Sequence, residues 1–338
     1  MLGAVDQGLI AAIMALGVFL TFRILNFADL TVDGSYTAGA VTTGIMIFNG
    51  VPPVPAAVAG MLAGAMAGLA TGVLHTKFHI DPLLASILVM LAMYTVNTRI
   101  LYQGHDGVER STVGLLNKTT LFTGLVEHRL RGTWVSVSLI GAGVVVVALA
   151  MVWFLSTKFG FAVTTTGDNP DMASAMGIST TLTKIVTLMV SNGLVGLSGA
   201  VAAQYGGGAT LEDGRGMILV GLASVILGNA IFGTRYLWLA AIGVVVGAVL
   251  YRLAIFWALK WEFIKNSDMK LISAALVVVA LVLSQSKSAN ALVTRLSPWR
   301  RRSDLPEQMS VAPNQFSPMA QVDAAHEASS VALKKRDQ

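Results

Sequence analysis

The chain has 338 residues, of which 54% are hydrophobic and only 12% are charged, with 34 glycines, no cysteine and a formal net charge of +5. Soluble domains carry about 25% charged residues, so this composition excludes an ordinary soluble protein and predicts an integral membrane protein. The absence of cysteine excludes disulfides, thiolate metal sites and a cysteine nucleophile. The apolar runs are long and continuous, which predicts membrane helices rather than the short alternating strands of a barrel.

Four apolar runs occupy the first part of the chain. Residues 8–25 are long enough to cross a bilayer, and a break with asparagine, aspartates and glycine follows at residues 25–35. The next run, residues 36–48, is short and predicts a half-spanning helix. Two further spans are predicted at residues 56–74 and 82–101. A helix broken at membrane depth is tolerated only where it lines a cavity or packs inside protein, so the first break is of functional interest.

The predicted span at residues 56–74 carries glycines at every fourth position. Gly60, Gly64 and Gly68 would lie on one face of a helix, where a second helix can approach closely. The alternative is an ordinary glycine-rich membrane helix.

The second half of the chain follows a long polar loop at residues 102–133, in which we expect one short element. A fifth span is predicted at residues 134–155, and a polar segment at residues 160–183 separates it from the rest. The remaining runs predict spans at 184–204, 217–231, 236–255 and 270–283, followed by a polar tail at 284–338 without a fold of its own.

The polar segment at residues 160–183 contains the signals of a short helix. Asn169 can cap the first turn, Pro170 suits the first helical position, and Asp171 favours the positive end of the helix dipole. Gly177 offers the left-handed conformation that ends a helix. The sequence therefore predicts about two helical turns between Pro170 and Gly177, with a plain connecting loop as the alternative.

The order of pieces recurs in the two halves of the chain. Residues 8–101 and 184–283 each contain a long span, a break with glycine and acid, a short run and further spans, and the span at 134–155 lies between them. One intervening crossing would make the two repeats face opposite ways, as in many transporters. We therefore expect an all-α polytopic membrane domain at residues 1–285, with about nine spanning or half-spanning helices in two inverted repeats, and a tail at 286–338. Shared composition alone is the alternative origin of the pattern.

Positive charge in short loops predicts the orientation. The segment at residues 160–183 and the C-terminal tail fall on the basic side, which places both in the cytoplasm and the N-terminus outside. Basic residues of the tail at 300–302 could contact anionic lipid. The basic positions that decide the orientation are Arg23, Lys77, Lys158, Lys184, Arg235, Arg295, Arg300, Arg301 and Arg302.

The sequence lacks the motifs of several kinds of catalytic and binding site. The sequence contains no G-x-x-x-x-G-K-[ST] phosphate loop, so we expect no nucleotide hydrolysis by that route in this chain. His75 and His79 are four residues apart, but two histidines in a basic loop are more typical of a solvated surface than of a metal site. We expect no catalytic site, no metal, no cofactor and no nucleic-acid partner.

Polar residues inside apolar runs are the better functional candidates, because they cost free energy in a bilayer unless they pair or face water. Each also has a structural explanation: an amide can hydrogen-bond a neighbouring helix, and an acid at a helix break can cap the next helix. For Asp29 and Asp33 capping is the favoured explanation. The candidates for a translocation pathway are Asn26, Asp29, Asp33, Asn97, Asn192, Gln204 and Glu212.

Four ordered stretches carry a family likeness: LNFADLTVDGSYTAGA, DPLLASILVMLAMYTVNTRI, GFAVTTTGDNPDMASAMGI and GMILVGLASVILG. Together they resemble the bacterial ABC importer permeases of the branched-chain amino acid and ribose type, and within these the tryptophan/tyrosine (uncharacterised) ABC permease subgroup. The resemblance covers about residues 8–285.

The resemblance implies that residues 160–183 form the cytoplasmic coupling segment, whose short helix docks on a separate ATPase subunit. The sequence departs from the family pattern at Thr164, where relatives usually have arginine, so one ion pair with the ATPase or the membrane surface is missing. The residues carried over to ATPase coupling are Gly160, Gly167, Asp168, Asn169, Pro170, Asp171, Met172, Ala173 and Gly177.

The resemblance further implies two permease copies, two ATPase subunits and an external solute-binding protein in the bacterial inner membrane. The expected solute is an amino acid or a related compound, moved by alternating access. An ion-coupled secondary transporter or channel, driven through Asp29, Asp33 or Glu212, is the alternative function.

Overall fold

The computed structural model describes residues 1–103, 111–116, 118–124, 130, 132–232, 237–260, 275 and 278, all within one compact unit, residues 1–290. Apart from residues 275 and 278, the predicted span at 270–283 lies outside the described residues. The predicted tail at 286–338, with its basic patch at 300–302, lies outside them as well.

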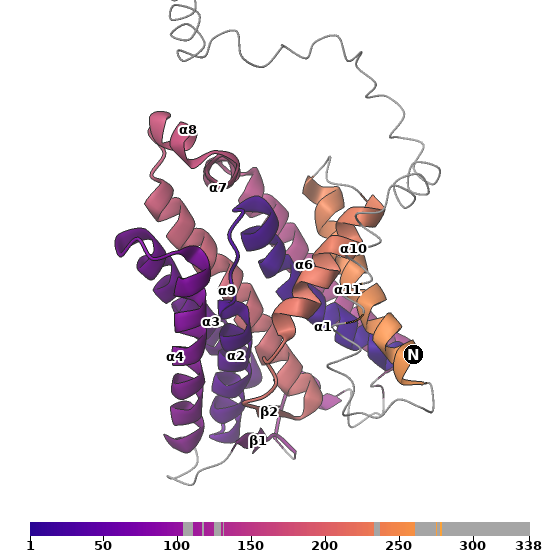
Figure 1. The fold of residues 1–338 in the computed structure, drawn as a ribbon. Helices are drawn as coiled ribbons and strands as arrows, with labels where there is room; N and C mark the ends of the chain where they lie inside the picture. Colours follow the sequence, from indigo (N-terminus) through magenta and orange to yellow (C-terminus); the bar gives the residue numbers. More distant parts are fainter. Residues whose placement is uncertain are drawn as a thin grey trace, which may run out of the picture. The chain divides into compact units, whose positions relative to one another are not determined.

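The described unit is built from helices, as predicted (Figure 1). Six of them are long and apolar enough to cross a membrane, which fits a polytopic membrane protein. The count of nine spans and the two inverted repeats stay predictions. The helices are α1 (Leu2–Val18), the π-helix η1 (Phe19–Ile24), α2 (Thr31–Phe48), α3 (Pro53–Lys77), α4 (Pro82–Gln103), α6 (Trp134–Ser156), α7 (Lys158–Asp168), α8 (Pro170–Ala175), α9 (Thr180–Gly206), α10 (Met217–Phe232) and α11 (Leu237–Leu259).

The break after the first span is shorter than predicted. Helix α2 begins at Thr31 and has 18 residues, so the predicted start at residue 36 was wrong. That this helix spans only part of the membrane stays a prediction. The physical reason lies in Asp29, whose Oδ1 accepts a hydrogen bond from the backbone N–H of Thr31 at 2.9 Å. This bond satisfies one free N–H of the first turn, so the helix starts at Thr31 and includes Asp33 and Gly34, which we had placed in the break.

Helices α3 and α9 pack through the predicted glycine face. A Cβ on Gly64 would collide with the carbonyl oxygen of Asn192, and a Cβ on Gly68 would collide with that of Leu188. Gly60 faces the carbonyl oxygen of Gly39 in α2, 2.7 Å from where its Cβ would lie. The close-packing explanation of the three glycines is therefore confirmed, and it fits the general use of small residues between membrane helices.

A small antiparallel sheet lies at one end of the helices. Strand β1 (Thr112–Gly114) belongs to the predicted polar loop and pairs with β2 (Gly208–Thr210), with Val113 opposite Ala209. Gly207 ends α9 in the left-handed conformation, with φ +78°, and so turns the chain into β2. Figure 1 shows the sheet at the opposite end of the helices from α7 and α8.

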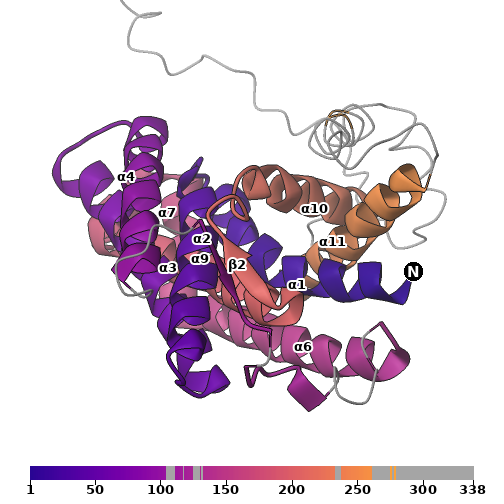
Figure 2. The ribbon, with the colours of Figure 1, turned by 90° about the horizontal axis from the view of Figure 1, so that it is seen from below.

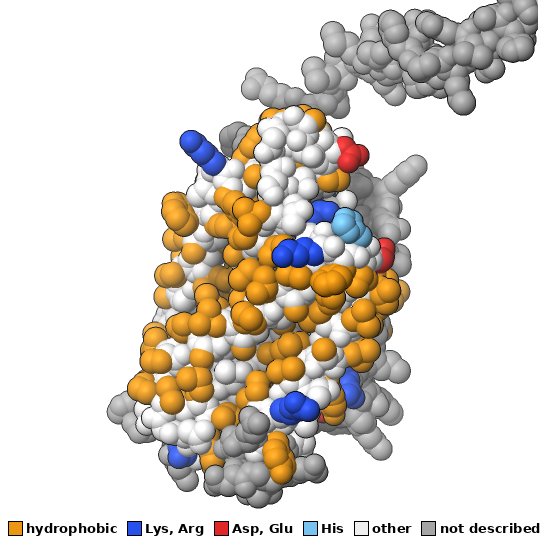
Figure 3. All heavy atoms as spheres, turned by 90° about the vertical axis from the view of Figure 1, so that its left-hand side faces the viewer, with side chains coloured by type: hydrophobic (Ala, Val, Ile, Leu, Met, Phe, Trp, Pro, Cys, Tyr) orange, Lys and Arg blue, Asp and Glu red, His pale blue; other side chains and the backbone are white. Residues whose placement is uncertain are grey.

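Helix α1 lies inside the unit, and α4 and α6 lie at its surface. Figure 2 shows α1 between α6 on one side and α10 and α11 on the other. Its large apolar side chains, such as Met14 and Leu16, are fully buried. Figure 3 shows a face on which hydrophobic side chains cover the middle and charged side chains gather toward both ends. This distribution is typical of a surface in contact with lipid.

Candidate functional site

The predicted coupling segment contains the short capped helix that the sequence indicates. The Oδ1 atom of Asn169 accepts a hydrogen bond from the N–H of Met172 at 2.9 Å, and Pro170 is the first residue of α8. Gly177 has φ +81°, and the N–H of Ile178 donates to the carbonyl of Ala173 at 3.0 Å. This last bond is the closing bond of a left-handed helix cap. The predicted start and end of the helix are confirmed.

The first half of the segment is also helical, which the sequence analysis missed. Helix α7 starts where the hydroxyl of Thr157 accepts a hydrogen bond from the N–H of Gly160 at 3.2 Å. A threonine at this position is a recognised helix start and could have revealed α7. Thr164, where the family pattern has arginine, donates its hydroxyl to the carbonyl of Phe161 in its own helix at 2.9 Å.

Helix α7 packs directly on the end of the first membrane helix. A Cβ on Gly167 would collide with the carbonyl oxygen of Ile24, the last residue of η1. Val163 is fully buried in a cluster with Leu25 and Phe27 of the first break. The predicted coupling segment therefore touches the point where the chain leaves the first span.

The outer surface of the segment is partly apolar. Met172 and Met176 are each 55% exposed, and Phe161 is 61% exposed. The two methionines are four residues apart, so they lie on one side of the α8 turn. Asp168 and Asp171 are exposed beside them, whereas Ala173 is buried.

Asp29 and Asn192, two of the predicted pathway residues, form a buried polar network. The Nδ2 of Asn192 donates to Oδ2 of Asp29 at 2.6 Å, and its Oδ1 accepts from the hydroxyl of Ser35 at 2.7 Å. With the bond from Asp29 to the N–H of Thr31, the network joins α9, α2 and the first break. All of its members are buried, so it fixes how these elements pack.

Asp33 caps a helix, but not the one we expected. Its two carboxyl oxygens accept hydrogen bonds from the N–H groups of Gly216 at 2.8 Å and Ile218 at 2.9 Å, at the start of α10. Because Asp33 itself lies inside α2, it cannot cap that helix, and the local capping assignment was wrong. Asn97 of α4 donates to the carbonyl of Gly34 in α2 at 3.2 Å.

The other three predicted pathway residues lie in loops or at helix ends. Asn26 is exposed and has φ +54°, so it serves the turn after η1. The amide of Gln204 accepts from the N–H of Leu121 at 3.0 Å and donates to the carbonyl of Pro53 at 3.3 Å. Glu212 pairs with Arg215 at 2.9 Å in an exposed loop.

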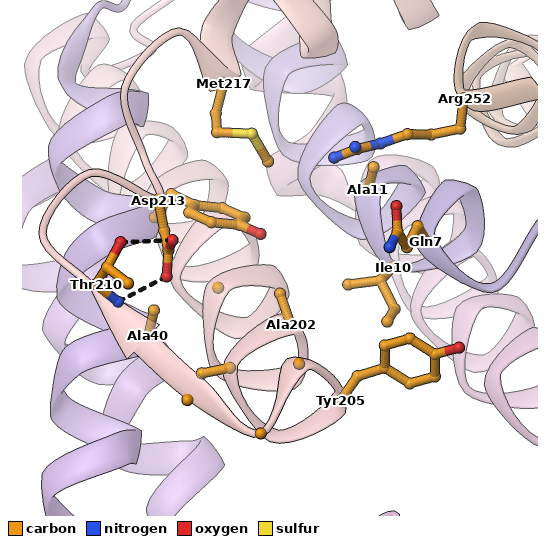
Figure 4. A pocket seen from close by; sticks show the side chains of 16 residues that line it. Gln7, Ile10, Ala11, Ala40, Ala202, Tyr205, Thr210, Asp213, Met217 and Arg252 are labelled. Atoms are coloured by element: carbon orange, nitrogen blue, oxygen red, sulfur yellow. Dashed lines mark hydrogen bonds between the residues drawn. The ribbon is translucent and has the colours of Figure 1, made fainter. Parts of the chain in front are cut away.

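A cavity of about 550 Å³ lies between α1, α2, α9, α10 and α11 (Figure 4). Its lining carries two charged side chains, Asp213 and Arg252, and two tyrosines, Tyr36 and Tyr205. None of the seven predicted pathway residues lines it. The sequence analysis missed Arg252, although an ionisable residue within a predicted span is by itself a sign of function.

Of the two described histidines, His75 takes part in packing and His79 lies in a turn. Nδ1 of His75 lies 2.9 Å from the carbonyl oxygen of Ile80, and its Nε2 lies 3.2 Å from Nζ of Lys184. His79 has φ +57° and turns the chain between α3 and α4. Among the residues that the structure describes, no three acidic or histidine side chains gather as a metal site would require.

Comparisons with known proteins agree with one another. The family described as "Branched-chain amino acid transport system / permease component" matches residues 1–282. The tyrosine transport system permease protein of Clostridioides difficile is 34% identical over 301 residues, which cover 88% of this chain and 97% of that protein. No solved structure matches.

Two further relatives are more distant. An uncharacterized protein of Rickettsia prowazekii is 31% identical over 68% of this chain and 76% of its own length. The autoinducer 2 import system permease protein LsrC of Salmonella paratyphi B is 27% identical over 71% of this chain and 64% of its own length. Because the family match spans most of the chain and the helices form a polytopic membrane unit, the chain belongs to the branched-chain amino acid permease family and is the membrane-spanning permease subunit of an ABC importer.

Proposed function

We propose that this permease moves an amino acid or a related small solute across the bacterial inner membrane, driven by a separate ATPase subunit that docks on residues 160–183. The main support for docking is the capped helix α8, which has Met172 and Met176 exposed on one side. The name of the relative in Clostridioides difficile, a tyrosine transport system permease protein, supports an amino acid as solute.

The docking surface suits a protein partner. Exposed apolar side chains outside the bilayer gain free energy when a partner buries them, by about 1.5–3 kcal/mol for a methionine. The caps at Asn169 and Gly177 keep α8 formed before docking, so little ordering entropy is lost on binding.

The contacts between α7 and the end of the first membrane helix support a route by which motion of the ATPase reaches the membrane helices. Helix α7 meets the carbonyl of Ile24 at Gly167, and the break that follows leads to Asp29 and its partner Asn192. A shift of the coupling segment would therefore displace the end of η1 and the network that joins α2 to α9. Alternating access would follow from such a displacement, since packed helices move as discrete units.

We assign the translocation pathway to the cavity lined by Tyr36, Asp213 and Arg252. Six of the seven residues predicted from sequence hold helices and loops in place through the contacts described above, and Asn26 forms the turn after η1. Asp29 and Asp33 already accept hydrogen bonds from the protein, which argues against their use as ion carriers.

The proposed assembly contains two copies of this permease, two ATPases and a solute-binding protein on the outer side. The coupling segment and the C-terminal tail would lie in the cytoplasm and the N-terminus outside, as the positive charges in short loops indicate. The proposed division of the chain is a permease domain at residues 1–285, with repeats at 8–101 and 184–283, and a tail at 286–338.

The docking proposal predicts that the double variant Met172→Ser/Met176→Ser lowers the affinity for the partner ATPase by about tenfold or more. Two apolar contacts are lost, while the cap at Asn169 remains. Affinity would be measured with purified permease in lipid nanodiscs and the immobilised ATPase. Replacing residues 169–173 by a flexible Gly/Ser linker should abolish binding.

Leu116→Ser is the matched control, because Leu116 is 84% exposed and lies near β1, away from α8. It should leave the ATPase affinity unchanged. Equal ATPase binding and equal stimulation of ATP hydrolysis by the wild type, the double variant and the linker variant would refute docking at this segment.

A further inference from the structure

The cavity contains one cationic and one anionic side chain on opposite sides. Arg252 reaches toward the cavity from α11, and Asp213 lies across from it on the loop before α10 (Figure 4). The Nε atom of Arg252 is buried and has no hydrogen-bond partner among the described residues. Asp213 accepts hydrogen bonds from the N–H and the hydroxyl of Thr210, each at 2.7 Å, which fix its carboxylate in place.

This pair of charges matches a ligand that carries both signs. A buried Nε without a partner is costly, and a ligand carboxylate can supply planar, bidentate hydrogen bonds to the guanidinium of Arg252. The carboxylate of Asp213 can accept further hydrogen bonds from an ammonium group. A ligand with only one charge would interact with only one of the two charged side chains.

The remaining lining is apolar or aromatic, apart from the uncharged polar side chains of Gln7 and Thr210. Ile10 and Met217 contribute apolar side chains, and Tyr36 and Tyr205 are only 6% and 8% exposed. The hydroxyl of Tyr205 donates to the buried Asp6 at 2.8 Å, which fixes the orientation of its ring. None of the other lining residues is ionised, so a charged ligand side chain would find no partner among them.

The geometry points to a binding site for a zwitterionic α-amino acid with an apolar or aromatic side chain, whose carboxylate pairs with Arg252 and whose ammonium group pairs with Asp213. The volume of about 550 Å³ lies within the usual range for small-ligand sites. Residues 206–208, between α9 and β2, form part of the wall, so the site lies toward the end of the helices that bears the sheet (Figure 1). This inference rests on the proposed function, in which that end faces the solute-binding protein.

The test measures binding of radiolabelled L-tyrosine to the permease–ATPase complex in lipid nanodiscs without the solute-binding protein. Competition by tyramine, which lacks the carboxylate, and by 3-(4-hydroxyphenyl)propanoate, which lacks the ammonium group, separates the two contacts. Arg252→Gln should weaken L-tyrosine binding about tenfold or more and leave tyramine binding unchanged. Asp213→Asn should weaken L-tyrosine binding and leave binding of the propanoate unchanged.

Two further variants keep the result interpretable. Arg252→Lys retains the charge and should bind L-tyrosine more tightly than Arg252→Gln. Arg215→Gln removes an exposed arginine of the same loop that pairs with Glu212 outside the cavity, and it should bind L-tyrosine like the wild type.

The assignment of the site is wrong if the wild-type complex does not bind L-tyrosine. It is also wrong if the wild type, Arg252→Gln and Asp213→Asn bind L-tyrosine equally. Formation of the permease–ATPase complex reports separately on the proposed function. If the permease–ATPase complex is stable but the two charge variants bind L-tyrosine like the wild type, the proposed amino acid site is wrong and the proposed function stands.

Discussion

Gly39→Ala is expected to destabilise the purified permease by about 3 kcal/mol, because overpacking between two helices forces their backbones apart. An added Cβ at Gly39 of α2 would collide with the carbonyl oxygen of Gly196 in α9 and lie 2.6 Å from its Cα. The atoms in the way belong to the backbone, so no side-chain rotation can relieve the contact. The melting temperature in detergent and the monodisperse fraction on size exclusion would both fall.

Gly143→Ala is the matched control for this substitution. Gly143 also lies inside a membrane helix, α6, but its added Cβ would meet no atom within 4 Å. Alanine favours a helix over glycine by up to about 1 kcal/mol, so this variant should melt at the same or a higher temperature. Equal melting temperatures of Gly39→Ala and Gly143→Ala would contradict the close packing of α2 on α9.

Asn192→Leu is expected to cost about 3 kcal/mol, because it leaves a buried carboxyl oxygen of Asp29 and the hydroxyl of Ser35 without their partner. Leucine has the same branched side-chain skeleton as asparagine and is larger, so the loss comes from hydrogen bonding and overpacking and not from a cavity. The expected observation is a lower melting temperature, together with a loss of transport.

A double-mutant cycle isolates this contact. Asp29→Asn retains an acceptor for the N–H of Thr31 but removes the carboxylate that Asn192 contacts. If the network is as described, the double variant Asn192→Leu/Asp29→Asn is less destabilised than the sum of the two single variants. Strict additivity would show that the two side chains do not interact.

The sequence was most informative where local chemistry decides the structure. Asn169, Pro170 and Gly177 form a helix start and end through neighbours within a few residues, and the structure has both as predicted. Close packing at the glycine face of α3 was one of two explanations that the sequence offered, because small residues spaced four apart lie on one face of a helix.

The sequence was less informative where contacts join distant residues. Asp33 caps α10, although about 180 residues separate it from Gly216. The same holds for Asn192, whose partners Asp29 and Ser35 belong to the other half of the chain. Local reasoning could only offer these side chains as candidates for capping or for a pathway.

The cavity was missed for a related reason. Its charged residues, Asp213 and Arg252, come from two different elements, and neither forms a motif with its neighbours. Arg252 lies within a predicted span, and an ionisable residue at such a position is the one sequence signal that could have marked it. Only the packing of α1, α2, α9 and α11 brings the lining together.

The most direct test of the account is solute uptake into proteoliposomes. We expect L-tyrosine to enter only when the permease, its ATPase, its solute-binding protein and ATP are all present, and we expect Met172→Ser/Met176→Ser to reduce this uptake. Uptake by the permease alone, driven by a proton or sodium gradient without ATP, would contradict it.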